Sequence, residues 1–159
     1  MSRSIGCLHV HACPASLRAA ADSVVASALA DQPPLCWTPL DDTLSASSTW
    51  QGGPGSAAAI ADGLRRLGAI TFEVTEDPSP GVDGERFCFV PDLGFFHAAT
   101  NAIGDVVVDE NQLAAAIREA PNAEALRARL ARLIGRPWDD ALEPLRMRAW
   151  PSTRVAATG

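Results

Sequence analysis

Thr71-Phe-Glu-Val-Thr-Glu-Asp-Pro-Ser-Pro-Gly-Val-Asp-Gly-Glu-Arg-Phe87, with its continuation to His97, is the stretch on which the predicted fold depends. Apolar and polar residues alternate from Ile70 to Thr75, which is typical of a half-buried strand. Pro78 and Pro80 then remove two backbone donors, so a regular sheet cannot continue there. The alternation resumes near the end of the quoted stretch. The pattern therefore predicts two strands joined by a stiff acidic loop.

Strand and helix patterns alternate in the residues before this stretch. The expected elements are a strand from Ser4 to Ala12, a helix from Pro14 to about Ala30, a short strand from Leu35 to Leu40, a turn from Asp41 to Ser48, a short strand that ends at Thr49-Trp50-Gln51, and a helix that ends at Gly68. Together with the strand that follows, they give the order β-α-β-β-α-β. This order predicts a ferredoxin-like core in an α+β protein.

The second half predicts an antiparallel meander followed by helices. The strands expected there run from Arg86 to Val90, from Gly94 to Thr100 and from Asp105 to Val108; the helices are one capped by Asp109 and Gln112, one with a leucine stripe that ends at Gly135, and a short one from Pro137 to Leu142 that stops before Pro144. We expect residues 1–150 to form a single α+β domain and residues 151–159 to be a short frayed tail.

Composition excludes several classes of function. The formal net charge of −6 over 159 residues argues against nucleic acid and against anionic membranes, because both attract basic surfaces. No stretch approaches eighteen apolar residues, so we expect a cytoplasmic protein with free thiols. We expect no cofactor, and no nucleophile-base pattern assigns a catalytic residue.

Four segments together resemble one known family. They are Thr49 to Gly55, Phe72 to Arg86, Pro91 to Ala98 and Pro137 to Pro144, and they are similar to the actinobacterial family catalogued as domain of unknown function 3145. The resemblance implies an actinobacterial source and no established activity. Some members are encoded near fatty-acid-synthesis genes, so it also implies a link to fatty-acid or acyl-CoA metabolism and a partner from fatty-acid synthesis or acyl-CoA carboxylation.

Three histidines are weak candidates for a metal site. His9 and His11 share one face of the first predicted strand, and His97 lies on another strand. Imidazoles with a carboxylate nearby can hold zinc or iron if they converge on one ion. Histidines in such positions can equally pack in the sheet, and we give that interpretation more weight.

Two further motifs precede predicted helices. Cys13 stands at a predicted helix N-cap before Pro14, where the helix dipole would favour a thiolate. A plain helix cap is the commoner role for such a residue. The glycine-rich turn supplies a second candidate, because free amides at a helix start can bind phosphate. The candidate anion-binding residues are Gly52, Gly53, Gly55 and Ser56.

A partner-binding surface is the third kind of candidate. Its residues come from the acidic loop, the strand that leads to His97 and one face of a C-terminal helix: Glu76, Asp77, Pro78, Pro80, Asp83, Glu85, Arg86, Asp92, Phe95, His97, Arg129, Arg132 and Arg136. A stiff loop loses little entropy when a partner binds. An arginine face can attract an acidic partner such as an acyl carrier protein.

Two functions from different classes remain open at this point. The first is an accessory module that binds another protein or subunit without catalysis. The alternative is a small enzyme or ligand-binder for an acyl-CoA or another phosphate-bearing anion, in which Gly52 to Ser56 cradle phosphate and His97 or Glu73 acts as base.

Overall fold

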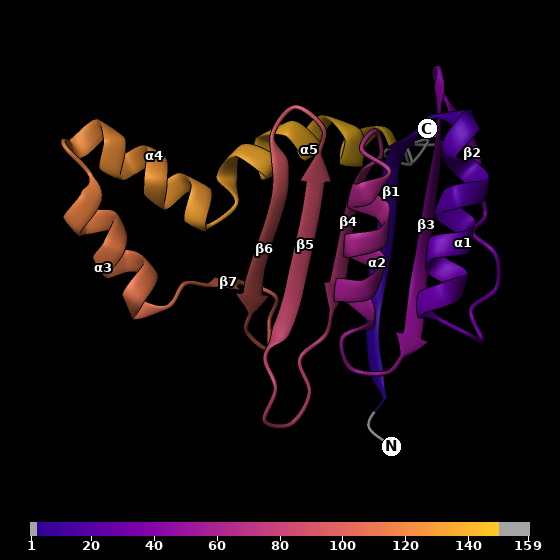
Figure 1. Ribbon diagram of the computed structural model, residues 1–159, viewed down its shortest axis with the longest axis horizontal. Coiled ribbons are helices and arrows are strands. Elements are labelled where there is room, and N and C mark those ends of the chain that lie inside the picture. The colour runs from indigo at the N-terminus through magenta and orange to yellow at the C-terminus, as the bar shows by residue number, and fades with distance from the viewer. Residues whose placement is uncertain (1–2, 150–159) are drawn as a thin grey trace, which may run out of the picture.

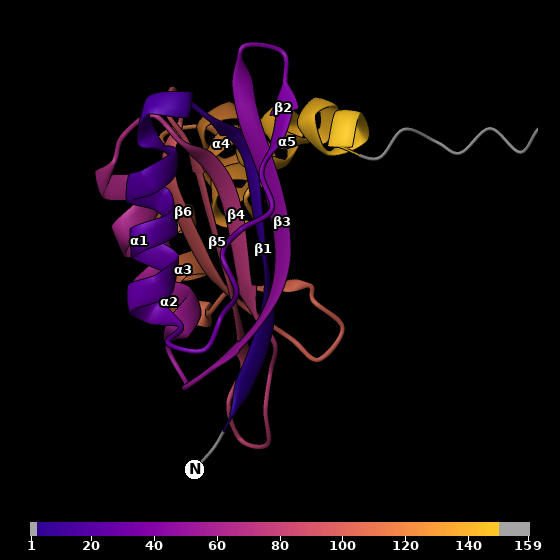
Figure 2. The same cartoon turned by 90° about the vertical axis from the view of Figure 1, so that its right-hand side faces the viewer.

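Alternation of apolar and polar residues places β1 (Ser4–Cys13) between two neighbours in the middle of a seven-stranded antiparallel sheet. The structure is a computed structural model that describes residues 3–149. The sheet order is β2-β3-β1-β4-β5-β6-β7, with helices on both faces (Figures 1 and 2). The mixture of helix and sheet confirms the predicted α+β class.

The helices and strands occur in the predicted order. The other strands are β2 (Thr38–Leu40), β3 (Thr43–Gly52), β4 (Thr71–Glu76), β5 (Gly84–Val90), β6 (Gly94–Thr100) and β7 (Val106–Val107). The helices are α1 (Arg18–Ala28), α2 (Ser56–Arg66), α3 (Glu110–Glu119), α4 (Ala123–Leu133) and α5 (Arg136–Ala149), with one turn of 3-10 helix at Ala15–Leu17. Asp109 and Gln112 form the predicted capping box of α3.

The main hydrophobic core lies between the sheet and the helices α1 and α2, which cover the same face (Figure 2). Helix α2 contributes Ile60 and Leu64, and the strands contribute Leu8, Phe72 and Val74. All five side chains are at most 1% exposed. This face therefore has little room for a ligand.

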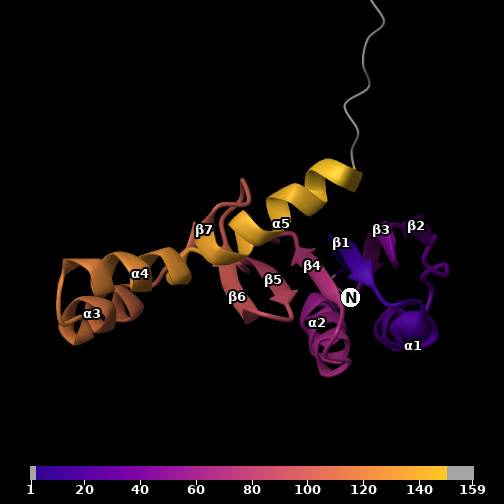
Figure 3. The ribbon, with the colours of Figure 1, turned by 90° about the horizontal axis from the view of Figure 1, so that it is seen from above.

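A second, smaller core lies on the opposite face, under α5 (Figure 3). Trp138 and Leu142 of α5 pack on Cys88 and Phe96 of the sheet. The Trp138 indole also donates a hydrogen bond to the carbonyl of Gly94 at 2.9 Å. These contacts attach the C-terminal helix to β5 and β6.

The predicted turn from Asp41 to Ser48 is wrong. Strand β3 begins at Thr43, and only Asp41 and Asp42 remain as the tight connection to β2. Asp41 adopts the left-handed conformation, with a φ of 51°, which aspartate tolerates better than most residues. Serine and threonine occupy the strand because one face of β3 is open, while Ala46 and Trp50 face the core.

The predicted end of the last helix before Pro144 is also wrong. Helix α5 continues to Ala149 with Pro144 inside it. A proline costs roughly 3 kcal/mol in a helix interior. That cost is offset because α5 is held to the sheet on both sides of Pro144, by Trp138 before it and by Arg146 after it. The predicted tail, residues 151–159, lies outside the described residues.

Candidate functional site

Helices α3 and α4 form a hairpin that projects beyond the edge of the sheet (Figures 1 and 3). Among the side chains of α3 only Ala116 is buried, and in α4 none is. Helices of this length are marginal in water by themselves and normally depend on a packed apolar face. The hairpin therefore lacks, within the described chain, the cover that such helices usually have.

Exposed apolar side chains are concentrated in this part of the chain. Five of the eight large apolar side chains that are exposed among the described residues lie between positions 103 and 134: Ile103, Val107, Leu113, Ile117 and Ile134. Leu113 and Ile117 are one helical turn apart on α3, and Ile117 is 65% exposed. The leucine stripe of α4 is only half-buried, and Leu113 and Ile117 of α3 are exposed. Clustered exposed apolar residues are typical of interaction sites.

The edge of β6 beside the hairpin is mostly unpaired. Strand β7 pairs with β6 only at Ala99 and Thr100. The amide of Asn101 donates to the carbonyl of Asp105 on that side. Because backbone groups alternate along a strand, the groups of Phe95 and His97 point to the same open side. We call the exposed hairpin residues Leu113, Ile117 and Ile134, with this free edge, the hairpin-edge surface.

Phe95 and His97 sit on the α2 face of β6. The Arg65 guanidinium lies 5.0 Å from the centre of the Phe95 ring, which is half-buried. His97 is exposed, stacks on Phe87 with the ring centres 4.3 Å apart, and lies 3.2 Å from a Glu85 carboxylate oxygen. Both predicted partner-binding residues are therefore next to the free edge.

The three predicted docking arginines do not form one free face. Arg129 binds Glu119 of α3 at 2.9 Å, Arg132 lies 4.9 Å from the centre of the Trp138 ring, and Arg136 binds Asp140 at 2.9 Å. The first contact joins the two helices of the hairpin, and the second ties α4 to α5. Only Arg132 and Arg136 remain exposed on the surface.

A network of charged side chains holds α5 on the sheet. Glu73 of β4 accepts hydrogen bonds from His11 Nε2 at 2.8 Å, from Arg86 at 3.1 Å and from both Nε and Nη2 of Arg146. Asp139 of α5 binds the same two arginines, at 2.6 Å and 3.0 Å. Arg86, which was predicted to be a partner-binding residue, pairs with these two carboxylates instead. Arg86 is consequently enclosed in this network and is not a surface residue.

Electrostatics keep the network ionised. Burial alone would raise the pKa of Glu73, but hydrogen bonds from His11 and Arg146 hold it well below its usual range. Burial likewise opposes ionisation of Asp139, and hydrogen bonds from Arg86 and Arg146 lower its pKa. Burial raises the pKa of the neighbouring Cys88 thiol to about 12. The ionised network thus attaches α5 to the sheet. The raised pKa of Cys88 disfavours its thiolate form.

The acidic loop projects from the lower end of β4 and β5 (Figure 1). Asp77 to Asp83 are exposed, and Ser79 and Val82 exchange backbone hydrogen bonds across the loop. Pro78 and Pro80 therefore sit in a self-bonded turn, as a stiff loop requires. Asp92 lies at the opposite end of β5, in the turn before β6, and does not belong to the same surface.

Glu76 is not part of this exposed loop. Its side chain turns inward, and its carboxylate accepts the amides of Gly55 at 3.0 Å and Ala57 at 3.2 Å. Gly55 has a φ of 85° and is the N-cap of α2. The chain's own carboxylate thus occupies the amides that were predicted to bind an external anion. The Ser56 hydroxyl donates to the carbonyl of Gly53, and Gly52 ends β3.

The three histidines do not converge. His9 and His11 are on the α5 face of the sheet, whereas His97 stacks on Phe87 on the α2 face. No group of three potential ligands suited to a metal ion occurs in the described part of the chain. The three weak candidates for a metal site therefore do not share one site, because β1 and β6 present these side chains to opposite faces.

Cys13 does not cap a helix. It is the last residue of β1 and fully buried, and Pro14 rather than Cys13 precedes the helical turn. Burial, followed by the nearby charge of Asp22, raises the pKa of its thiol. This environment disfavours the thiolate that redox chemistry needs.

The fold and site define an α+β protein with an exposed helical hairpin beside an open sheet edge. The chain belongs to the family described as "Protein of unknown function (DUF3145)", which matches residues 7–155. Comparison with the curated proteins and with the solved structures gives no match. Within the described residues, no helix is long and apolar enough to cross a membrane.

Proposed function

We propose that this protein is a non-enzymatic accessory module that binds another protein through the hairpin-edge surface. The observation that carries this proposal is the exposure of Leu113 and Ile117 on a two-helix hairpin that buries only Ala116. Such an arrangement is unfavourable in isolation and becomes favourable when a partner covers it. Docking of a partner would give the hairpin a function, since the hairpin adds little buried surface to the sheet.

The partner that suits this surface is acidic. Helix α4 carries three arginines and one glutamate, but Arg129 is paired with Glu119 of α3. The exposed Arg127 and Arg132 therefore supply the positive charge, although the whole chain has a net charge of −6. Complementary charge favours encounter and orientation more than affinity. An acyl carrier protein or a subunit of acyl-CoA carboxylation meets this requirement, and the family resemblance is the support for that choice.

The open edge offers a way to add affinity. A partner segment in extended conformation can hydrogen-bond to the free groups of Phe95 and His97 and lengthen the sheet. The apolar side chains of the hairpin would then cover that segment. The acidic loop adjoins the Ile103 turn at the lower end of this region and gives the surface a distinct acidic border.

We also infer a ferredoxin-like unit in the first half. The sheet order β2-β3-β1-β4, with every neighbouring pair antiparallel and helices α1 and α2 on one face, supports this assignment. The unit would serve as the rigid base from which β5, β6 and the hairpin extend.

The test is purification of the tagged chain from its native host at natural expression level, with quantitative mass spectrometry. One acidic protein at near-equal stoichiometry is expected. The double variant Leu113→Ser, Ile117→Ser should lose it. Ile5→Ser, which changes a side chain 49% exposed on β1, is the matched control and should retain it. Recovery of a bare monomer, or equal recovery with the double variant, would overturn the proposal.

A further inference from the structure

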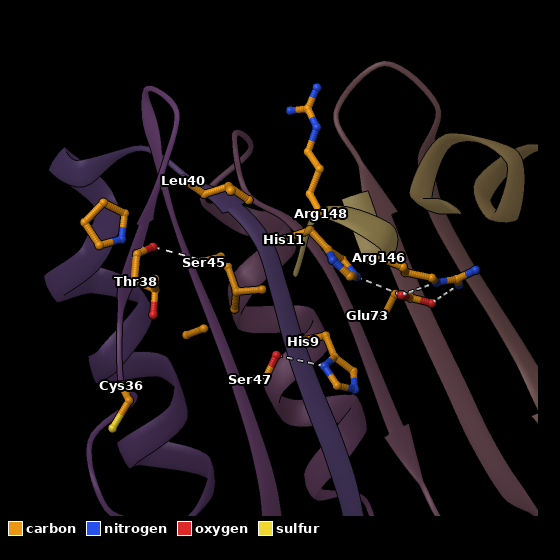
Figure 4. A pocket seen from close by; sticks show the side chains of 13 residues that line it. His9, His11, Cys36, Thr38, Leu40, Ser45, Ser47, Glu73, Arg146 and Arg148 are labelled. Carbon is orange, nitrogen blue, oxygen red and sulfur yellow. Dashed lines mark hydrogen bonds and ion pairs between the residues drawn. The ribbon is translucent and has the colours of Figure 1, made fainter. Parts of the chain in front are cut away.

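A groove of about 860 Å³ lies on the α5 face, between the β2-β3 hairpin and the C-terminal part of α5 (Figure 4). Its residues from β1, β2 and β3 lie toward one end of the sheet, and the α3-α4 hairpin lies beyond β6 and β7 at the other end (Figure 1). Its lining combines apolar residues, hydroxyls, imidazoles and arginines. The residues that matter here are His9, His11, Thr38, Leu40, Ser45, Ser47, Glu73, Arg146 and Arg148.

His9 is the group best placed to meet a ligand. Its Nδ1 lies 3.0 Å from the Ser47 hydroxyl, and the described residues provide no hydrogen-bond partner for its Nε2. The neighbouring His11 is different, because its Nε2 is bound to Glu73. Figure 4 shows His9 and Ser47 side by side on β1 and β3, apart from the Glu73 contacts. The imidazole of His9 is thus fixed at one nitrogen and open at the other.

The charge of the lining favours an anion. Two arginines and two histidines line the groove, and Glu73 is its only carboxylate among the described residues. That carboxylate is already bound by His11, Arg86 and Arg146. A cation would therefore find no free acidic ligand. Arg146 is paired with Glu73 and Asp139, so the groups left for an anion are the free nitrogen of His9 and Arg148, whose partner Asp41 is exposed.

Arg148 stands at the rim and can change partners. It binds Asp41 of the β2-β3 turn at 2.9 Å, with both side chains more than half exposed. An exposed ion pair of this kind contributes little to stability. A ligand oxyanion can therefore replace Asp41 at little cost. Leu40 and Pro39 provide an apolar wall beside this position.

We propose that this groove binds a small molecule with a carboxylate or phosphate group next to an apolar portion. The oxyanion binds Arg148 at the rim in place of Asp41, the apolar portion rests against Leu40, and His9 with Ser45 and Ser47 lines the groove further along β1 and β3. This site is separate from the hairpin-edge surface and from the Gly52 to Ser56 turn, so its failure leaves the proposed accessory role untouched.

Binding is expected to strengthen as the pH falls from neutrality toward the lowered pKa of His9. Burial, and then the adjacent His11, lower the pKa of His9, with Arg146 adding to this and Glu73 opposing it. The groups that face His9 are His11 on its own strand, Ser47 on β3, Glu73 on β4 and Arg146 on α5. A bound anion favours the imidazolium, so ligand and proton bind together.

The experiment is an NMR titration of the His9 ring with inorganic phosphate, hexanoate and hexyl phosphate at constant ionic strength. Saturable shifts at His9 are expected with at least one hexyl compound, and the better of the two identifies the oxyanion. Arg148→Gln should weaken binding about tenfold, as loss of one charge-assisted hydrogen bond implies. Arg66→Gln, which alters an exposed ion pair on α2, should bind normally.

Alkylation of Cys36 gives an independent readout. This thiol is exposed and lines the groove, whereas Cys7 lies on β1 outside it. The ligand should slow modification of Cys36 and leave Cys7 unchanged. Absence of a saturable shift at His9 with all three probes, or equal binding by Arg148→Gln and the wild type, would overturn the proposal.

Discussion

The guanidinium of Arg146 in α5 grips the carboxylate of Glu73 in β4, with Nε 3.0 Å from one carboxylate oxygen and Nη2 bound to the other. The two residues are 73 positions apart in the chain, so this contact fixes α5 on the sheet. Helix α5 in turn carries the α3-α4 hairpin through the contact of Arg132 with Trp138. The buried charges therefore position the hairpin-edge surface.

Replacement of Glu73 by Gln should destabilise the protein strongly. The variant leaves Arg86 and Arg146 without their main acceptor, and removal of one partner from a buried ion pair typically costs about 3–5 kcal/mol. Urea denaturation measures the free energy of unfolding. Glu143→Gln is the matched control, because Glu143 contacts the same Arg146 at 3.5 Å but is 63% exposed, and it should change stability by less than about 1 kcal/mol. Equal losses would contradict a buried clamp.

Stability should depend on pH below neutrality. The folded-state pKa values of Glu73 and Asp139 are lowered, while the unfolded chain has values of about 4.3 and 3.9. A lowered pKa contributes stability that is complete above the unfolded pKa and is lost as the pH falls toward the folded pKa. The free energy of unfolding should therefore change little between about pH 7 and 5 and fall below about pH 4. Glu73→Gln should show a shallower fall; parallel curves would rule out Glu73 as a source.

Gly135 should tolerate no side chain at the junction of α4 and α5. Its φ is 79°, and an added Cβ would lie 2.7 Å from the ring of Phe96. Gly104 is a matched control, since its φ is 88° and an added Cβ would meet nothing within 4 Å. Gly104→Ala should cost about 1–2 kcal/mol from backbone strain alone. Gly135→Ala should cost roughly 1–3 kcal/mol more, and similar losses would show that the junction is not packed as described.

Two apolar truncations, one on a buried face and one on an exposed face of the C-terminal helices, should differ in their effect on the free energy of unfolding. Leu142 of α5 is fully buried against the sheet, so Leu142→Ala should cost about 2–5 kcal/mol. Ile117 is 65% exposed on α3, so Ile117→Ala should stay within about 0.5 kcal/mol of the wild type. Thermal and urea unfolding measure both. A large loss for Ile117→Ala would mean that the free protein already covers this side chain.

The order of the elements could be predicted because local patterns determine it. The alternation around Phe72, the capping box at Asp109 and the glycine before α2 depend on neighbouring residues. The turn predicted at Asp41 to Ser48 was wrong because Ser48 interrupts the apolar alternation of Leu44, Ala46 and Trp50, and the hydroxyl residues of the open face are also typical of a turn. Helix α5 was predicted too short because Pro144 is a local signal, and the contacts that override it come from distant strands.

The candidate site was harder to predict for the same reason. A helical stripe such as Leu113 and Ile117 indicates which residues share a face, but not whether another element covers that face. The partners of Glu73 are spread over β1, β5 and α5, and no spacing connects them. One signal was available: Asp139 and Arg146 lie two turns apart, beside Trp138 and Leu142, if residues 136–149 are read as one helix.

Site-specific photo-crosslinking in the native host can show whether a partner docks at the hairpin-edge surface. A photoreactive residue replaces Ile117 in one variant and Ile5 in another, since both positions are exposed. We expect position 117 to crosslink to one acidic protein, the same one that co-purifies with the chain, and position 5 not to crosslink to it. A crosslink from position 5 alone, or none from position 117 while the partner still co-purifies, would contradict docking at the hairpin-edge surface.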